Sequence, residues 1–140
     1  MRRRHKARRW VLQILYAWEI QGRPGRLADE ASAFFERRRI APETRGFAEE
    51  LIQVLDRHVE GIDRLLAESA ENWDLDRMSI IDRNVLRLAL AELLYFADIP
   101  FKVSIDEAVT LARRYGGEDS PRFVNGVLDA AAHRLDLIPS

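Results

Sequence analysis

The 140-residue sequence contains no cysteine, only three histidines and no long hydrophobic run. The absence of cysteine excludes disulfides, thiolate nucleophiles and cysteine-based zinc sites. His5, His58 and His133 lie far apart in the sequence, and none has other ligands at metal spacing. A lone helical histidine is most often a surface or packing residue. We therefore expect neither a metal nor a cofactor.

Sequence features of enzymes are also scarce. No glycine-rich phosphate loop is present, because Gly116-Gly117 has neither a preceding strand nor the Lys-Ser/Thr ending of such a loop. Acidic pairs such as Glu49-Glu50 are common on helices and do not by themselves indicate acid–base catalysis. We expect a protein that is not an enzyme.

The apolar residues that follow the N-terminus do not predict a signal peptide or a membrane span. They are interrupted by Gln13 and Glu19, and no small-residue cleavage site follows. No apolar run approaches the roughly 20 residues needed to cross a bilayer. These observations predict a cytoplasmic protein that does not bind membranes.

Charge is distributed unevenly along the chain. The formal net charge is −1, yet residues 1–9 carry five Arg and one Lys with no acid. The remaining residues hold all 23 Asp and Glu and only 16 of the 22 Lys and Arg. A basic end on an acidic body is typical of a protein that binds a polyanion, but a solvated, disordered tail has the same composition. Charge alone leaves both alternatives open.

Helical periodicity is the main positive feature of the sequence. Apolar residues recur at helical spacing in six segments, which are residues 4–21, 28–38, 43–67, 79–99, 104–115 and 120 onward. Around residues 72–76 the periodicity lapses, which predicts a turn or short helix. No segment has the alternation of a strand. The expected fold is an all-α bundle of six or seven helices.

Several polar residues predict where helices begin. Ser79 is a good N-cap, Ser104 with Glu107 forms a capping-box pattern, and Ser120 before Pro121 combines a cap with a first-turn proline. These residues place the starts of the last three helices.

One charged residue interrupts the most apolar of these helices. Arg87 lies among leucines and alanines, so its guanidinium needs a carboxylate partner or a route to solvent. We expect it to pair with Glu107 or with another acid on a neighbouring helix.

The basic residues at the N-terminus are unfavourable for the helix that follows them, because the N-terminal end of a helix dipole favours anions. If that helix begins near Arg4, then Arg4 and Arg8 share one side of it, while Arg2, Arg3 and His5 stay flexible. A bound polyanion would neutralise these charges. This argument favours nucleic acid as the ligand.

Two aromatic residues are candidates for stacking on a base, one near the basic segment and one at the start of the last helix. Tyr16 lies two turns after Arg8, and Phe123 follows Arg122 at the expected start of the last helix. An aromatic ring beside an arginine is suited to stacking on an unpaired base. Both rings also fit core positions, and for a phenylalanine at a periodic position that alternative is the commoner one.

Three groups of residues stand in an order and at a spacing that resemble one known family. They are residues 7–8 (AR) with 13–18 (QILYAW); 82–89 (DRNVLRLA) with 92–93 (EL); and 100–108 (PFKVSIDEA) continuing through 115–120 (YGGEDS) to 123–128 (FVNGVL). Together they resemble the NusB family of bacterial transcription antitermination factors. The resemblance covers nearly the whole chain.

This resemblance implies an all-α fold of two packed helical subdomains, which form a single RNA-binding domain over residues 1–140 with residues 1–9 as a basic arm. It implies binding of the single-stranded boxA element of ribosomal RNA leader transcripts. It also implies a heterodimer with the ribosomal protein NusE, acting with RNA polymerase and other Nus factors in the elongation complex to promote processive transcription of rRNA operons. Whether the free protein is a monomer or a homodimer stays open.

The resemblance also implies the residues that contact each partner. Together with the basic run, the RNA-contacting residues are expected to be Arg2, Arg3, Arg4, His5, Lys6, Arg8, Gln13, Tyr16, Asp119, Arg122 and Phe123. Asp82 and Arg83 are expected to face the protein partner. Arg9 stands where relatives can have an acid, and it extends the basic surface.

Two other functions are compatible with such a fold. An RNA-cytosine methyltransferase family carries a NusB-like domain, but a chain without cysteine and without a cofactor-binding βα unit is not predicted to be that enzyme. A helical protein-interaction scaffold without specific RNA readout is the second alternative. The salt dependence of binding distinguishes that scaffold from an RNA-binding protein.

Overall fold

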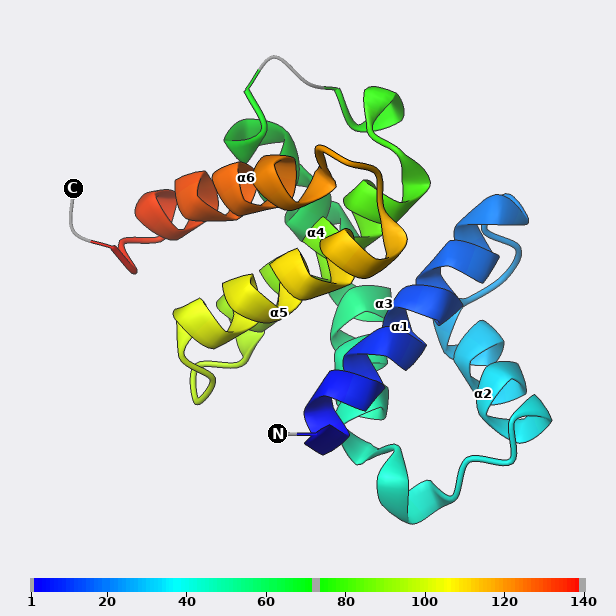
Figure 1. Cartoon of the computed structure of the whole chain (residues 1–140). Coiled ribbons are helices and arrows are strands. Elements are labelled where there is room, and N and C mark those ends of the chain that lie inside the picture. The colour runs from blue at the N-terminus through cyan, green and yellow to red at the C-terminus, as the bar shows by residue number, and fades with distance from the viewer. Residues whose placement is uncertain (1, 72–73, 139–140) are drawn as a thin grey trace.

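The computed structural model describes residues 2–71 and 74–138, and this part of the chain is entirely helical, without a strand (Figure 1). Its elements are α1 (Arg2–Ile20), α2 (Leu27–Arg37), the 3-10 helix η1 (Pro42–Thr44), α3 (Gly46–Ser69), the 3-10 helix η2 (Leu75–Arg77), α4 (Ile80–Tyr95), α5 (Phe101–Tyr115) and α6 (Ser120–Arg134). The all-α prediction is confirmed. Part of the turn or short helix predicted at 72–76 is η2, while Asn72 and Trp73 lie outside the described residues.

The helices form two packed halves (Figure 1). One half consists of α1, α2 and the beginning of α3, and the other consists of α4, α5, α6 and the end of α3. α3 belongs to both halves and is kinked at His58, whose φ of −119° and ψ of 17° are not helical. α4 lies at the centre, with residues 84–92 buried and with contacts to α1, α3, α5 and α6. The N-terminal end of α4 lies close to α1, since Asn84 Nδ2 donates a hydrogen bond to Glu19, and close to the α5–α6 turn, since Asp82 and Gly117 line one hollow.

The starts of α4 and α5 differ in how well they follow from the sequence. Ser79 caps α4 as predicted, with its Oγ accepting a hydrogen bond from the backbone N–H of Asp82 at 3.0 Å. α5 begins at Phe101, three residues before the predicted cap. The Oγ of Ser104 instead donates a hydrogen bond to Glu92 Oε1 at 2.7 Å inside the protein. The capping-box prediction is wrong, because Ser104 lies inside α5 and its hydroxyl bonds to a charged acceptor on a different helix.

The turn between α5 and α6 is shaped by a glycine and a serine. α6 includes Ser120 as its first residue, with Asp119 rather than Ser120 at the N-cap position. The Oγ of Ser120 accepts a hydrogen bond from the backbone N–H of Gly117 at 2.9 Å. A Cβ added to Gly116 would lie 2.5 Å from that same Oγ, so this turn requires glycine. The turn places Asp119 beside the N-terminal end of α4.

Arg87 pairs with acids on neighbouring helices, as expected, and these acids are Glu19 on α1 and Asp63 on α3 rather than Glu107. Its Nε lies 2.7 Å from Asp63 Oδ1, and its Nη1 lies 2.8 Å from Glu19 Oε2. A buried guanidinium needs such compensation, and two carboxylates from two neighbouring helices supply it. The ion pairs of Arg87 therefore tie α1 and α3 to α4.

Glu19 is the centre of this network. Besides the contact with Arg87, it accepts hydrogen bonds from Arg83 Nε at 2.7 Å and from Asn84 Nδ2 at 3.0 Å. Burial by itself would raise the pKa of Glu19, but the hydrogen bond from Arg83, the charge of Arg87 and the hydrogen bond from Asn84 together hold the pKa below its ordinary value. Glu19 is therefore a carboxylate at neutral pH.

Candidate nucleic-acid interface

The basic N-terminal residues belong to a helix rather than to a flexible arm. α1 begins at Arg2 and continues to Ile20, so the flexibility expected for Arg2, Arg3 and His5 is corrected to helix. In a helix, residues three or four positions apart lie on the same side. α1 therefore decides which cations face the protein body and which stay open to a ligand.

One side of α1 is held to the body by ion pairs. The side chain of Arg8 is 2% exposed, and its Nε and Nη2 lie 2.7 Å and 2.8 Å from the two carboxylate oxygens of Glu92. His5 Nδ1 lies 2.6 Å from Glu107 Oε2, and Arg8 Nη1 lies 3.7 Å from the other oxygen of Glu107. The guanidinium of Arg8, which was predicted to contact RNA, is desolvated and already paired with Glu92. Arg8 holds α1 against α4 instead.

The outer side of α1 carries an open row of residues, which we call the α1 stripe and define as Lys6, Arg9, Gln13 and Tyr16. Lys6 and Tyr16 are exposed, Tyr16 by 38%, and Arg9 and Gln13 are half-buried. The Nε of Arg9 and the Oε1 of Gln13 are shielded from solvent without a hydrogen-bond partner among the described residues. Buried polar atoms are rarely left unpaired, which makes these two atoms candidates for binding a ligand. A ligand that rearranges the two side chains would break no existing hydrogen bond of either atom.

Two further cations lie at the beginning of α1. Arg3 and Arg4 are exposed. The Arg4 guanidinium lies 4.7 Å from the centre of the Phe47 ring and 3.9 Å from the Asp98 carboxylate. These long contacts leave the charge at the surface, where it adds to the positive potential of the α1 stripe.

A groove of about 700 Å³ adjoins the α1 stripe, and we call it the α1/α2 groove. It is lined by Leu12, Gln13, Tyr16, Ala17, Phe34, Arg37, Arg38, Ile81 and Tyr115. Two predicted RNA contacts, Gln13 and Tyr16, lie here beside two arginines that were not predicted. The sequence signal for those arginines is the basic run 37–39, but its position next to Tyr16 depends on how α2 packs on α1.

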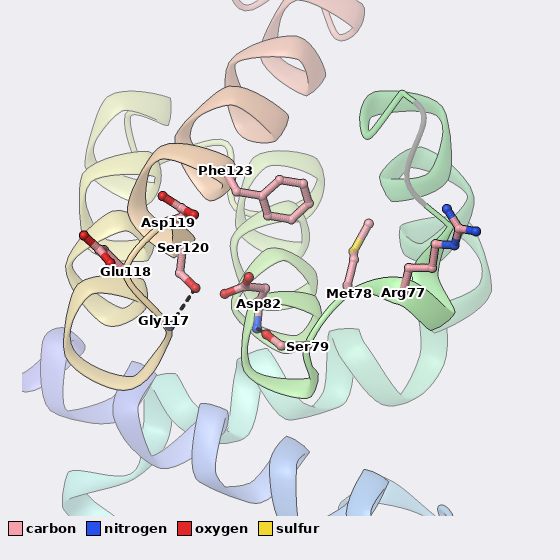
Figure 2. A pocket seen from close by; sticks show the side chains of 9 residues that line it. All are labelled: Arg77, Met78, Ser79, Asp82, Gly117, Glu118, Asp119, Ser120 and Phe123. Atoms are coloured by element: carbon pink, nitrogen blue, oxygen red, sulfur yellow. Dashed lines mark hydrogen bonds between the residues drawn. The ribbon is translucent and has the colours of Figure 1, made fainter.

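A second hollow, of about 430 Å³, lies between the beginnings of α4 and α6, and we call it the α4/α6 groove (Figure 2). It is lined by Arg77, Met78, Ser79, Asp82, Gly117, Glu118, Asp119, Ser120 and Phe123. The ring of Phe123 projects from the first turn of α6 across the hollow toward Met78 (Figure 2). The structure thus brings the predicted residues Asp82, Asp119 and Phe123 together.

The two grooves are neighbours on one surface. Ile81 lines the α1/α2 groove and the next residue, Asp82, lines the α4/α6 groove. Likewise Tyr115 belongs to the first groove and Gly117 to the second. Predicted RNA contacts that are about 100 positions apart in the sequence therefore line two grooves that adjoin at α4 and at the end of α5.

The remaining predicted residues divide between this surface and the interior. Arg122 is exposed and lines a smaller hollow beside Phe123. The Oδ1 of Asp82 is shielded without a hydrogen-bond partner among the described residues. The Arg83 guanidinium turns inward to Glu19, at 2.6 Å, and to the Leu75 carbonyl oxygen, also at 2.6 Å. Arg83 therefore supports the fold, and of the two predicted partner-facing residues only Asp82 lines an open groove.

Comparison with known proteins identifies the family of the chain. Residues 5–133 match the sequence model of the NusB family. The chain belongs to the NusB family. The transcription antitermination protein NusB of Myxococcus xanthus is 45% identical over 135 residues, which are 95% of this chain and 96% of that protein. The predicted family is confirmed.

Solved NusB structures share the fold. The structure of T. maritima NusB matches with a TM-score of 0.85 at 37% identity, over 93% of this chain and 90% of that one. A structure of the antitermination factors NusB and NusE in complex with double-stranded RNA matches with a TM-score of 0.84 at 29% identity, over 96% of this chain and 98% of the other. Their agreement over nearly the full length confirms the NusB-like fold predicted from the sequence.

Two general properties complete the description of this NusB-family chain. Within residues 2–71 and 74–138, no helix is both long and apolar enough to cross a bilayer. The same residues contain no group of three or more His, Asp or Glu side chains placed to hold a metal ion. The relatives are named transcription antitermination proteins, and that name specifies no enzymatic activity.

Proposed function

We propose that this chain is an RNA-binding transcription antitermination factor that acts by binding rather than by catalysis. Its ligand is the single-stranded boxA element of ribosomal RNA leader transcripts, and its protein partner is NusE. Together with RNA polymerase and other Nus factors, the pair promotes processive transcription of rRNA operons in the cytoplasm. Residues 1–140 act as a single domain, with the basic residues 1–9 as part of its RNA-binding surface.

The observation that carries this proposal is the path of cationic and aromatic side chains that runs from the α1 stripe to Phe123. Cations on the outer side of α1 supply sequence-independent attraction to phosphates. Tyr16 and Phe123 offer rings on which unpaired bases stack. The related NusB in complex with NusE and RNA, whose structure matches nearly all of this chain, supports RNA and NusE as ligands.

The charges of the two grooves support a division of roles. The α1/α2 groove contains Arg37 and Arg38 and no acid, so it suits the phosphate backbone. The α4/α6 groove contains Asp82, Glu118 and Asp119 against Arg77, so it suits base amino groups or a basic protein. Ribosomal proteins bind RNA and are typically basic, which makes Asp82 a suitable contact for NusE.

The test is a titration of the full chain with labelled boxA RNA, a scrambled RNA of equal composition and a boxA duplex, each with and without NusE. We expect preferential binding of the single-stranded boxA RNA in the presence of NusE. The slope of log K against log salt should shrink by about 0.7 for each phosphate contact removed, so by about 1.4 for Lys6→Gln/Arg9→Gln.

Three outcomes would contradict the proposal in whole or in part. Equal affinity for boxA and scrambled RNA in the presence of NusE would remove specific RNA recognition. A salt slope that is unchanged by Lys6→Gln/Arg9→Gln, and also by the additional substitutions Arg3→Gln and Arg4→Gln, would favour the protein-interaction scaffold. Preference for the duplex would retain an RNA-binding function but exclude single-stranded boxA as its target.

A further inference from the structure

The α1/α2 groove contains a pair of cations that suit phosphate, but the part of the RNA that they bind is not yet assigned. Arg37 is in the last turn of α2 and Arg38 is its C-cap residue, and both line the groove. Basic residues at a helix C-terminus favour the helix dipole, which is the purely structural explanation of Arg37. That explanation does not account for the position of both arginines at the rim of a groove whose other polar residues lie on α1 and α5.

The contacts of these arginines leave their charges available. The Arg37 side chain is 62% exposed, and its Nη2 lies 3.9 Å from Glu30 Oε2, which is too long for a hydrogen bond. The Arg38 guanidinium lies 4.7 Å from the centre of the Phe34 ring, so the ring orients it without neutralising it. Both guanidinium groups therefore retain donors for an anion at the groove.

Tyrosine rings stand on the other side of the same groove. Tyr16 comes from α1 and Tyr115 from the end of α5, and the Arg114 guanidinium lies 5.3 Å from the centre of the Tyr115 ring. The groove thus combines cations with two rings in a volume of about 700 Å³. A nucleotide requires this combination, because its phosphate binds arginine donors while its base stacks on a ring.

We propose that the α1/α2 groove holds one nucleotide of the bound RNA, with its phosphate on Arg37 and Arg38 and its base against Tyr16 or Tyr115. This site rests on the proposed RNA-binding function and extends the RNA path beyond α1 onto α2. The strand runs from the α1 stripe through the α1/α2 groove to the α4/α6 groove. The negatively charged phosphate of this nucleotide lies in the groove that has cations and no acid.

The experiment compares the wild type with Arg37→Gln/Arg38→Gln in titrations with single-stranded boxA RNA across a salt series. We expect the variant to bind at least about tenfold more weakly, because two charge-assisted contacts are lost. The salt slope should decrease by about 1.4. Arg37→Lys/Arg38→Lys should keep the wild-type slope while losing part of the affinity, because lysine keeps the charge but not the bidentate geometry.

Arg57→Gln/Arg64→Gln is the matched control. It removes the same charge from two exposed positions of α3 that line neither groove, and it should change affinity by less than about threefold. Thermal melting and circular dichroism of each variant show whether α2 is still folded. A variant that melts at a lower temperature is assayed well below its transition.

The outcomes separate this site from the function on which it rests. If the wild type does not bind boxA RNA, the proposed function fails. If the wild type binds and Arg37→Gln/Arg38→Gln changes RNA affinity no more than the control Arg57→Gln/Arg64→Gln, the groove makes no phosphate contact and the site is overturned. If Arg37→Gln/Arg38→Gln keeps RNA affinity but loses NusE, the groove is a protein-binding site and the nucleotide assignment is wrong.

Discussion

At the scale of single residues, Glu19 shows how a polar side chain stabilises this helical protein. Its carboxylate is 12% exposed and lies between the guanidinium groups of Arg83 and Arg87. Removing one member of such a network leaves the others buried and uncompensated, which costs more than the pair itself contributes. Glu19 is therefore important for stability although it lines neither groove.

We expect Glu19→Gln to lower the free energy of unfolding by about 3 kcal/mol at pH 7, because Arg83 and Arg87 lose their shared negative partner. Urea denaturation measures this change. Glu49→Gln is the control, since Glu49 is 53% exposed and pairs with Arg45 only at the surface, where a pair is worth less than about 1 kcal/mol. Equal effects of both substitutions would show that the network does not stabilise the fold.

The same substitution has a predictable pH dependence. The pKa of Glu19 is lower in the folded protein than its ordinary value, so its stabilising effect is fully present above that value and is lost as the pH falls through the folded pKa. The difference between the wild type and Glu19→Gln should be constant above about pH 5.5 and should shrink below about pH 4.3. A difference that grows with acidification would contradict this sign.

At the scale of elements, α1 illustrates what the sequence can and cannot predict. Its existence follows from local periodicity, as does that of the other five helices in the described residues. The spacing of Lys6, Arg9, Gln13 and Tyr16 is also local, but the sequence did not show which side of α1 stays open, and Arg8 rather than Arg9 was predicted to contact RNA. The burial of Arg8 was not visible in the sequence, because its partner Glu92 lies 84 positions away and only the packing of α1 on α4 brings them together.

The same reason explains the other differences. Ser104 lies inside α5 rather than at its start, and its hydroxyl bonds to Glu92 on another helix, 12 positions away. The family resemblance placed Arg83 on the partner-facing surface, and its actual neighbour Glu19 lies 64 positions away in the sequence. In each case the sequence indicated a charged or polar residue that needed a partner, and the tertiary fold decided which partner it found.

Arg8→Ala should destabilise the protein by about 3–5 kcal/mol, because it leaves Glu92 buried without its cation. Arg8→Met/Glu92→Leu should recover most of that loss, since an apolar pair of similar volume has no buried charge to compensate. Thermal and urea unfolding measure both variants.

The double variant also tests the assignment of Arg8 to the fold. It should bind boxA RNA as tightly as the wild type, because Arg8 is not on the RNA path. Loss of RNA binding in a variant whose melting temperature matches the wild type would return Arg8 to the binding surface.

At the scale of the whole molecule, the net charge of −1 conceals an uneven distribution of charge over two adjacent surfaces. The cations of α1 and α2 border the groove assigned to phosphate, whereas three of the four charged residues in the α4/α6 groove are acidic. Fields of opposite sign on adjacent surfaces let RNA and a basic protein approach at different places. The RNA phosphates and the basic protein are then attracted to different surfaces, although the end of the RNA strand shares the α4/α6 groove with NusE.

This arrangement predicts that two matched charge changes have different effects on the rate at which NusE associates. Asp82→Asn/Glu118→Gln removes two negative charges from the α4/α6 groove and should slow association several-fold at low salt, with a smaller effect on dissociation. Lys6→Gln/Arg9→Gln removes two positive charges and should leave that rate unchanged or raise it slightly. Stopped-flow mixing over a salt series measures both rates, and the difference should fade as the screening length falls below about 8 Å. If the Lys6/Arg9 variant were the slower one, NusE would approach over α1, and the assignment of separate surfaces would be wrong.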